Sequence, residues 1–156
     1  MDVLTLQAAG VRYGLELSAV QGVIVRPPLR PLVDAPAWAA GVFRLRGRLI
    51  PVVDLNLLHG GAPSRPSYAA RVVIVTATAP GGRSRSLGLL AEHVTDIVSV
   101  DERTLTSPGI ATPETPWLGA LAPSPQGDLL QLVNVAGLLT DEARSRLVFD
   151  EEPPRD

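Results

Sequence analysis

The stretch that decides the fold runs from Gly41 to Leu55 and reads GVFRLRGRLIPVVDL. Two apolar runs flank Arg46 and Gly47, and glycine accepts the positive φ that a tight turn needs. A two-residue turn at this point pairs Leu45 with Arg48 in an antiparallel hairpin. Both faces of that hairpin are apolar, which predicts that both are covered by other parts of the chain.

The tip of this hairpin carries three arginines, Arg44, Arg46 and Arg48. Guanidinium groups are costly to bury without partners, so the tip should lie at an edge or a cleft. One interpretation is a solvated turn that keeps the sheet edge soluble. The other is a protein-binding tip formed by these arginines around Gly47, because arginine is favoured in interfaces and in bidentate pairs with carboxylates.

The composition excludes several classes of protein. A chain of 156 residues with 46% hydrophobic residues can form one domain or two small packed units, while 15 Pro and 14 Gly predict short elements. The net charge of −2 gives no electrostatic footprint for nucleic acid, and the absence of Cys excludes disulfides and thiolate metal sites. No apolar run is long enough for a membrane span and no signal peptide is visible, so we expect a soluble, cytoplasmic protein without direct membrane insertion.

Short strands are expected along most of the chain. They cover residues 3–8, 11–17, 18–26, 71–77, 86–91, 93–100, 117–122 and 128–133, in addition to the hairpin. Single helical turns are expected over 37–40 and 55–58, and the apolar spacing of 135–147 predicts the one sizeable helix. Residues 59–68 and 101–116 are typical of loops, and 150–156 of a disordered tail.

An internal repeat relates the two halves of the chain. Gly14-Leu15 and Val23-Ile24 match Gly88-Leu89 and Ile97-Val98, and GRLIPVVDL from Gly47 matches GDLLQLVNV from Gly127. The repeat predicts an all-β fold of two similar units of about five strands, packed face to face as small barrels. We expect one domain over 1–149, with the first barrel over about 1–60 and the second over 69–135, and an exchange of strands between the barrels is left open.

Catalytic chemistry is hard to find in this sequence, so no enzyme, cofactor or metal site is predicted. His59 and His93 stand without a carboxylate or nucleophile motif and are interpreted as loop and surface residues. Asp54 is better explained as the N-cap of a short helix than as a catalyst, and Asn134 holds the same place in the repeat. Trp38, beside a proline-containing loop, fits either a core position or an interface anchor.

The hairpin resembles the hallmark of the CheW-like domain. Leu45-Arg46-Gly47 followed by Ile50-Pro51-Val52-Val53-Asp54-Leu55 carries the resemblance, which extends from about Val3 to Leu139. It implies two packed, five-stranded SH3-like β-barrels with short helices and a C-terminal helix. It also implies a non-catalytic scaffold of bacterial chemosensory signal transduction.

The resemblance implies two kinds of partner and a set of contact residues. One partner is the cytoplasmic tip of a chemoreceptor, a methyl-accepting protein, and the other is the regulatory domain of a CheA-like histidine kinase. The expected contact residues are Arg46, Arg44 and Gly47 at the tip, Val20 and Gly22 on the third strand, and Trp38. Relatives often carry Glu in place of Gly22 and Asn in place of Arg44, so a divergent paralogue serving surface motility or second-messenger output remains an alternative. A small ligand-binding β-barrel or enzyme is a further one.

Overall fold

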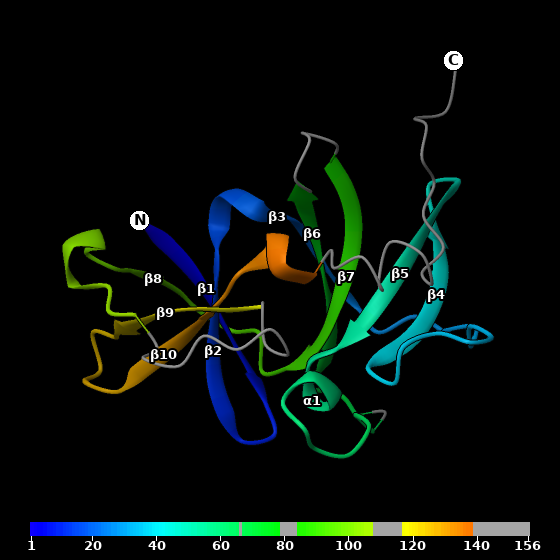
Figure 1. Ribbon diagram of the computed structural model, residues 1–156, viewed down its shortest axis with the longest axis horizontal. Helices are drawn as coiled ribbons and strands as arrows, with labels where there is room; N and C mark the ends of the chain where they lie inside the picture. The colour runs from blue at the N-terminus through cyan, green and yellow to red at the C-terminus, as the bar shows by residue number, and fades with distance from the viewer. Residues whose placement is uncertain (66, 79–83, 108–116, 139–156) are drawn as a thin grey trace.

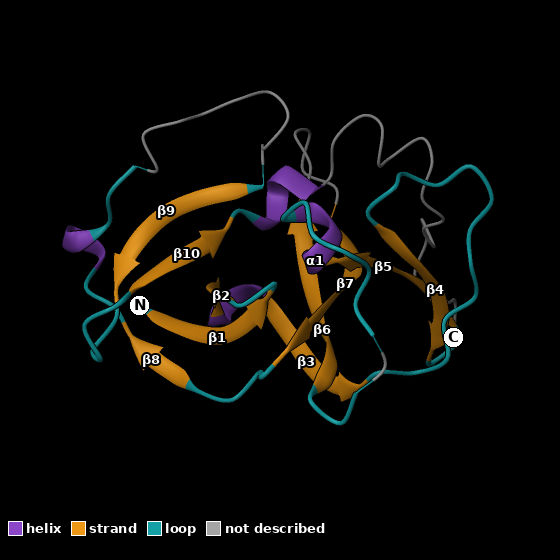
Figure 2. Ribbon diagram, turned by 90° about the horizontal axis from the view of Figure 1, so that it is seen from below, coloured by secondary structure: helices purple, strands orange, loops and turns teal. Residues whose placement is uncertain are grey.

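The structure is a computed structural model and describes residues 1–65, 67–78, 84–107 and 117–138. Within these residues ten strands form one continuous sheet that folds into two groups lying side by side (Figures 1 and 2). The strands are β1 Asp2–Ala8, β2 Val11–Glu16, β3 Val20–Val25, β4 Ala39–Leu45, β5 Arg48–Asp54, β6 Ala70–Thr78, β7 Ser84–Glu92, β8 Ile97–Ser99, β9 Leu118–Pro123 and β10 Leu129–Val133. The short helices are η1 Leu17–Ala19, α1 Leu55–Leu58, η2 Glu102–Thr104 and η3 Val135–Leu138.

The two groups are five-stranded SH3-like β-barrels. Barrel I consists of β3 to β7, in the pairing order β3-β6-β7-β5-β4. Barrel II consists of β1, β2, β8, β9 and β10, in the order β8-β1-β2-β10-β9. A single pairing of Gln7 with Glu92 joins β1 to β7 and makes the sheet continuous.

The internal repeat is confirmed by the pairing of strands far apart in the sequence. In barrel I, β5 runs parallel to β7 with Val52 opposite Gly88. In barrel II, β10 runs parallel to β2 with Leu132 opposite Gly14. Both glycines are required, because a Cβ at Gly14 would lie 2.5 Å from a methyl of Val3, and a Cβ at Gly88 would lie 2.6 Å from another valine methyl. The two barrels therefore repeat the same close approach at matching positions.

Each barrel is completed by a hairpin from the other half of the chain. The β6–β7 hairpin closes on β3 and β5 from the first half, and the β1–β2 hairpin closes on β8 and β10 from the second half. Neither barrel is thus formed by residues 1–60 or 69–135 alone, and the exchange of strands is reciprocal. The parallel pairs join strands that are far apart in the sequence, since consecutive strands joined by tight turns can only be antiparallel.

The largest hydrophobic cluster lies between the barrels. Leucines and valines of β1, β2, β6 and β7 meet there, and Tyr13 and Trp117 are buried among them. Each barrel also has a smaller interior of its own, around Ile50 and Val72 in barrel I and around Leu130 and Val3 in barrel II. The face-to-face packing predicted for the two units accounts for most of the core.

The central hairpin has the predicted register, with Leu45 opposite Arg48. Three local predictions were wrong or fall outside the described residues. Of the helical turn expected over 37–40, residues 37 and 38 form a simple turn and β4 already begins at Ala39, whose N–H donates to the Pro36 carbonyl. Only Ile97–Ser99 of the expected strand 93–100 is a strand, and the left-handed φ of +49° at His93 ends the extended course of β7. Of the helix over 135–147, η3 is described, and the remainder and the tail 150–156 lie outside the described residues.

Candidate partner-binding surface

The tip of the β4–β5 hairpin presents arginines on a constrained turn. Arg46 and Gly47 both have positive φ, +50° and +79°, as a type I′ turn requires. Arg46 is exposed, and Arg44 Nη1 donates a hydrogen bond of 3.3 Å to the Gly47 carbonyl. The Arg46 side chain is therefore exposed at the tip of a hairpin whose middle residues are buried. Such a charged group on a fixed backbone is suited to contact another protein.

Strand β3 holds the second set of predicted contact residues, on the same barrel. Val20 is half-buried and packs against the core between the barrels. A register shift in the pairing with β6 lies between Val20 and Gly22. A Cβ at Gly22 would meet nothing within 4 Å, so the fold does not require glycine there. The outward side chains of β3 include Val23 and Val25, which are 42% and 71% exposed and give this edge strand an apolar surface.

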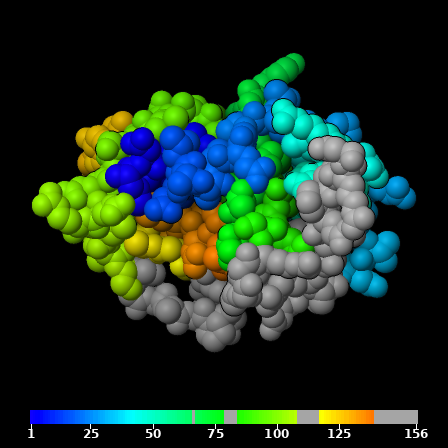
Figure 3. Space-filling model, turned by 90° about the horizontal axis from the view of Figure 1, so that it is seen from above, coloured from blue at the N-terminus to red at the C-terminus, as the bar shows by residue number. Residues whose placement is uncertain are grey.

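A groove between the barrels runs beside the start of β3. It is a cavity of about 440 Å³ whose walls come from the end of β2 and from η1, β6, β9, β10 and η3. Glu16, Ala19, Thr76 and Ala136 are among its lining residues. Figure 3 shows the start of β3 in blue, the ends of β6 and β7 in green and the orange segment of β10 and η3 gathered on this face. Val20, the first residue of β3, follows Ala19 directly.

Trp38 lies at the end of β4 opposite the arginine tip. It is half-buried and packs against the core between the barrels, so one part of its side chain stabilises the fold and the other part is exposed. Its carbonyl accepts the Asp54 N–H at 2.8 Å, and the carbonyl of its counterpart Trp117 accepts the Asn134 N–H at 2.7 Å. The repeat thus extends to these two backbone hydrogen bonds. The two tryptophans differ in burial, since Trp117 is only 6% exposed whereas Trp38 is half-buried.

Asp54 is a buried anchor that fixes the end of β5. Its carboxylate caps α1 by accepting the Asn56 N–H at 3.0 Å. It also accepts the Ser64 N–H at 2.8 Å and the Ser64 hydroxyl at 2.7 Å. The sequence pointed to the cap but not to Ser64, which lies in a Gly/Pro-rich loop without any pattern. Asp54 is 2% exposed and satisfied by structural partners, so it has a structural role.

His59 connects the two barrels on the face that carries α1. Its Nδ1 is hydrogen-bonded to the Tyr13 hydroxyl, so the expectation of a purely solvated loop residue was incomplete. Burial raises the pKa of Tyr13. A cavity of about 430 Å³ opens beside this pair and is lined mainly by Trp117 and leucines. Because these surroundings are mostly apolar, the geometry indicates that the pair serves packing between the barrels.

The described residues contain no group of three or more His, Asp or Glu side chains that could hold a metal ion. Within the same residues no helix is long and apolar enough to cross a membrane. The features that could meet a partner are the exposed edge strand β3, the groove between the barrels and the arginine tip. They define the class of the protein as a two-barrel protein-binding module.

Comparison with known proteins identifies the family within this class. The family model of the CheW-like domain matches residues 2–143. The chain belongs to the CheW-like domain family, and thereby to the chemotaxis coupling adaptors.

Two relatives and one solved structure illustrate the similarity. The chain is 30% identical over 112 residues to the chemotaxis protein CheW of Rhizobium meliloti (strain 1021), covering 71% of this chain and 69% of that protein. It is 27% identical over 146 residues to the chemotaxis protein CheW of Klebsiella aerogenes, covering 90% and 82%. The crystal structure of the scaffolding protein TtCheW from Thermoanaerobacter tengcongensis has the same fold, with a TM-score of 0.75, 23% identity and coverage of 89% and 87%.

Proposed function

We propose that this chain couples a chemoreceptor-like protein to a CheA-like histidine kinase in the cytoplasm, without catalysis of its own. The observation that carries the proposal is the match of the CheW-like domain to nearly the whole chain. Such an adaptor works by binding two partners, so that the binding of one changes the equilibrium of the other. The fold supports this role because the two barrels provide similar but chemically different surfaces.

The receptor contact is assigned to barrel I. Arg46, with Arg44 and Gly47, lies on the hairpin tip, and Val20 and Gly22 lie on β3, which follows the groove residue Ala19 in the chain. The turn supports the choice of Arg46, because its side chain is exposed at the end of the hairpin. The half-buried Trp38 is proposed as a more peripheral anchor. The kinase regulatory domain then docks on apolar barrel surface, through a barrel of its own.

The proposal is tested by binding of the purified chain to each partner from the same organism. The probes are the regulatory domain of the CheA-like kinase and a soluble fragment of the receptor tip. Arg46→Ala should keep the cooperative unfolding transition and weaken receptor binding by about tenfold, equal to ~1.4 kcal/mol. Arg65→Ala is the matched control, because Arg65 is also exposed but lies in the loop after Ser64.

Two results would contradict the assignment. Equal binding by the native chain and by the Arg46→Ala variant would remove Arg46 from the interface. Failure of the native chain to bind either probe would reject the adaptor function itself.

A further inference from the structure

The cavity of about 430 Å³ beside the Tyr13–His59 pair lies at the junction of the two barrels. Its walls come from the end of α1, which follows β5 of barrel I, and from β2, β9 and β10 of barrel II. Cavities that bind small molecules have this size and a mostly apolar lining, and they are common where two folded units meet. The apolar lining consists of Val11, Tyr13, Leu58, Trp117, Leu118, Leu121 and Leu129.

The opening of this cavity exposes aliphatic side chains on three neighbouring strands. Gln131 of β10 pairs with Tyr13 of β2 on one side and with Leu121 of β9 on the other. Because side chains alternate along a strand, Val11 and Leu129, each two positions earlier, lie on the same face. Leu129 is 59% exposed and Val11 is 36% exposed. Aliphatic side chains gathered around one opening in this way mark a contact site for another molecule.

His59 offers this cavity a hydrogen-bond donor. Its Nδ1 is the one partner of the Tyr13 hydroxyl among the described residues. Burial raises the pKa of Tyr13, which keeps the hydroxyl protonated, and a buried hydroxyl without an acceptor is unfavourable. Nδ1 is therefore the acceptor, and a neutral imidazole that accepts at Nδ1 carries its proton on Nε2. His59 is exposed, so this second N–H is available to an acceptor from outside the chain.

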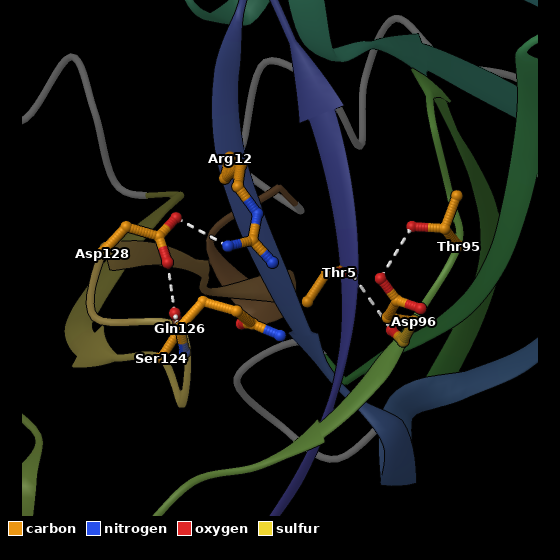
Figure 4. A network of polar contacts seen from close by, with 7 residues as sticks. All are labelled: Thr5, Arg12, Thr95, Asp96, Ser124, Gln126 and Asp128. Atoms are coloured by element: carbon orange, nitrogen blue, oxygen red, sulfur yellow. Dashed lines mark hydrogen bonds and ion pairs between the residues drawn. The ribbon is translucent and has the colours of Figure 1, made fainter.

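The charges around the cavity favour an anion over a cation. The described residues that line it include Arg12 and His59 but no aspartate or glutamate. Arg12 is held at 2.6 Å by Asp128, which lies outside the lining (Figure 4). The side-chain amide of Gln131 already donates to two backbone carbonyls at 2.9 Å. An ammonium group would find no counter-charge in this lining, whereas a carboxylate would form a charge-assisted hydrogen bond with His59.

We propose that this cavity binds a small apolar carboxylate, such as an alkanoate of medium chain length. Its carboxylate accepts the Nε2–H of His59, and its apolar chain packs on the leucines of α1, β9 and β10. An apolar molecule without an acceptor would cover this N–H and leave it without a partner. The inference goes beyond the proposed function and does not depend on it.

A direct test uses octanoate as the probe and octylammonium, which has the same chain and the opposite charge, as its control. The full chain, labelled with ¹³C in the leucine methyls and ¹⁵N in histidine, is followed by NMR during titration. The expected result is a saturable shift of Leu121, Leu129 and His59 with octanoate, and binding of octylammonium that is weaker by about tenfold or more. Leu45 in barrel I and the exposed His93 should not move. Absence of a saturable shift, equal affinity for both probes, or an equal shift at Leu45 would overturn the inference.

Two variants with matched controls locate the site. His59→Leu removes the donor and should weaken octanoate binding about tenfold, whereas His93→Leu, at the other histidine, should leave it unchanged. Leu129→Asp places a carboxylate at the opening and should reverse the preference to octylammonium. Its control is Ile97→Asp on β8, since Ile97 is 58% exposed, and this variant should keep the preference for octanoate. Leu129→Asp decides the matter if His59→Leu fails to fold, and an unchanged preference in it would contradict the inference.

A segment of a protein partner is the competing occupant, and the same signals separate the two. If Leu129 and His59 respond to the kinase regulatory domain or to the receptor tip but not to octanoate, the cavity is a protein interface. The carboxylate site is then rejected while the adaptor function stands. If octanoate binds and neither protein does, the carboxylate site stands and the proposed partners are wrong.

Discussion

Replacement of Asp54 by alanine should destabilise the fold more than the loss of a simple helix cap. The carboxylate accepts three hydrogen bonds, from the Asn56 N–H, the Ser64 N–H and the Ser64 hydroxyl. Loss of the cap alone costs about 1 kcal/mol. Ser64 is only 8% exposed, so its two donors are left buried without an acceptor, which costs about 1–3 kcal/mol more. The expected loss of unfolding free energy is therefore about 2–4 kcal/mol.

The measurement is urea unfolding followed by tryptophan fluorescence, which reports on Trp38 and Trp117. The Ser64→Ala variant is the matched control, because it removes one hydrogen bond of 2.7 Å and leaves the cap in place. It should cost about 1–2 kcal/mol, clearly less than Asp54→Ala. A loss below about 1 kcal/mol for Asp54→Ala would refute the reasoning, since it would mean that neither the cap nor the Ser64 contacts stabilise the fold.

Three further predictions address packing and pH. Gly88→Ala should cost roughly 1–3 kcal/mol in urea unfolding, because its Cβ would lie 2.6 Å from a core valine methyl, while Gly22→Ala, in open space, should stay within about 0.5 kcal/mol. Burial raises the pKa of the Tyr13 hydroxyl. The preference of the folded state for the neutral hydroxyl therefore contributes fully to stability below about pH 10, and this contribution is lost as the pH rises through the raised pKa. Tyr13→Phe should flatten the alkaline side of a pH–unfolding curve. The hydrogen bond from Ser124 lowers the pKa of Asp128, so that contribution is present above about pH 4 and is lost on acidification. Asp128→Asn should flatten the acidic side.

The features predictable from the sequence are those encoded by local pattern. The register of the central hairpin follows from Gly47, since a two-residue turn with positive φ fixes which residues face each other. The repeat also predicted two similar units with a shared core. Residues that match between the two halves occupy equivalent positions in the two barrels, as Gly14 and Gly88 do. The short helix after Asp54 follows from an ordinary capping pattern.

The remainder depends on contacts between segments far apart in the chain. The reciprocal exchange of the β1–β2 and β6–β7 hairpins could not be predicted from the sequence. The two hairpins have similar apolar patterns, so each could pair with strands of its own half or of the other half. Ser64 lies in a loop without periodicity, and its bond to Asp54 spans ten positions. The ion pair of Arg12 with Asp128 joins residues 116 positions apart, so no local pattern could predict it.

The central claim is that this chain binds two proteins at once, and a ternary complex tests it most directly. The kinase regulatory domain is immobilised, and the soluble receptor tip is added with and without the purified chain. The account predicts that the receptor tip is retained only when the chain is present, and that Arg46→Ala reduces this retention while the chain itself stays bound to the kinase domain. Retention of the receptor tip without the chain, or displacement of one partner by the other, would contradict it.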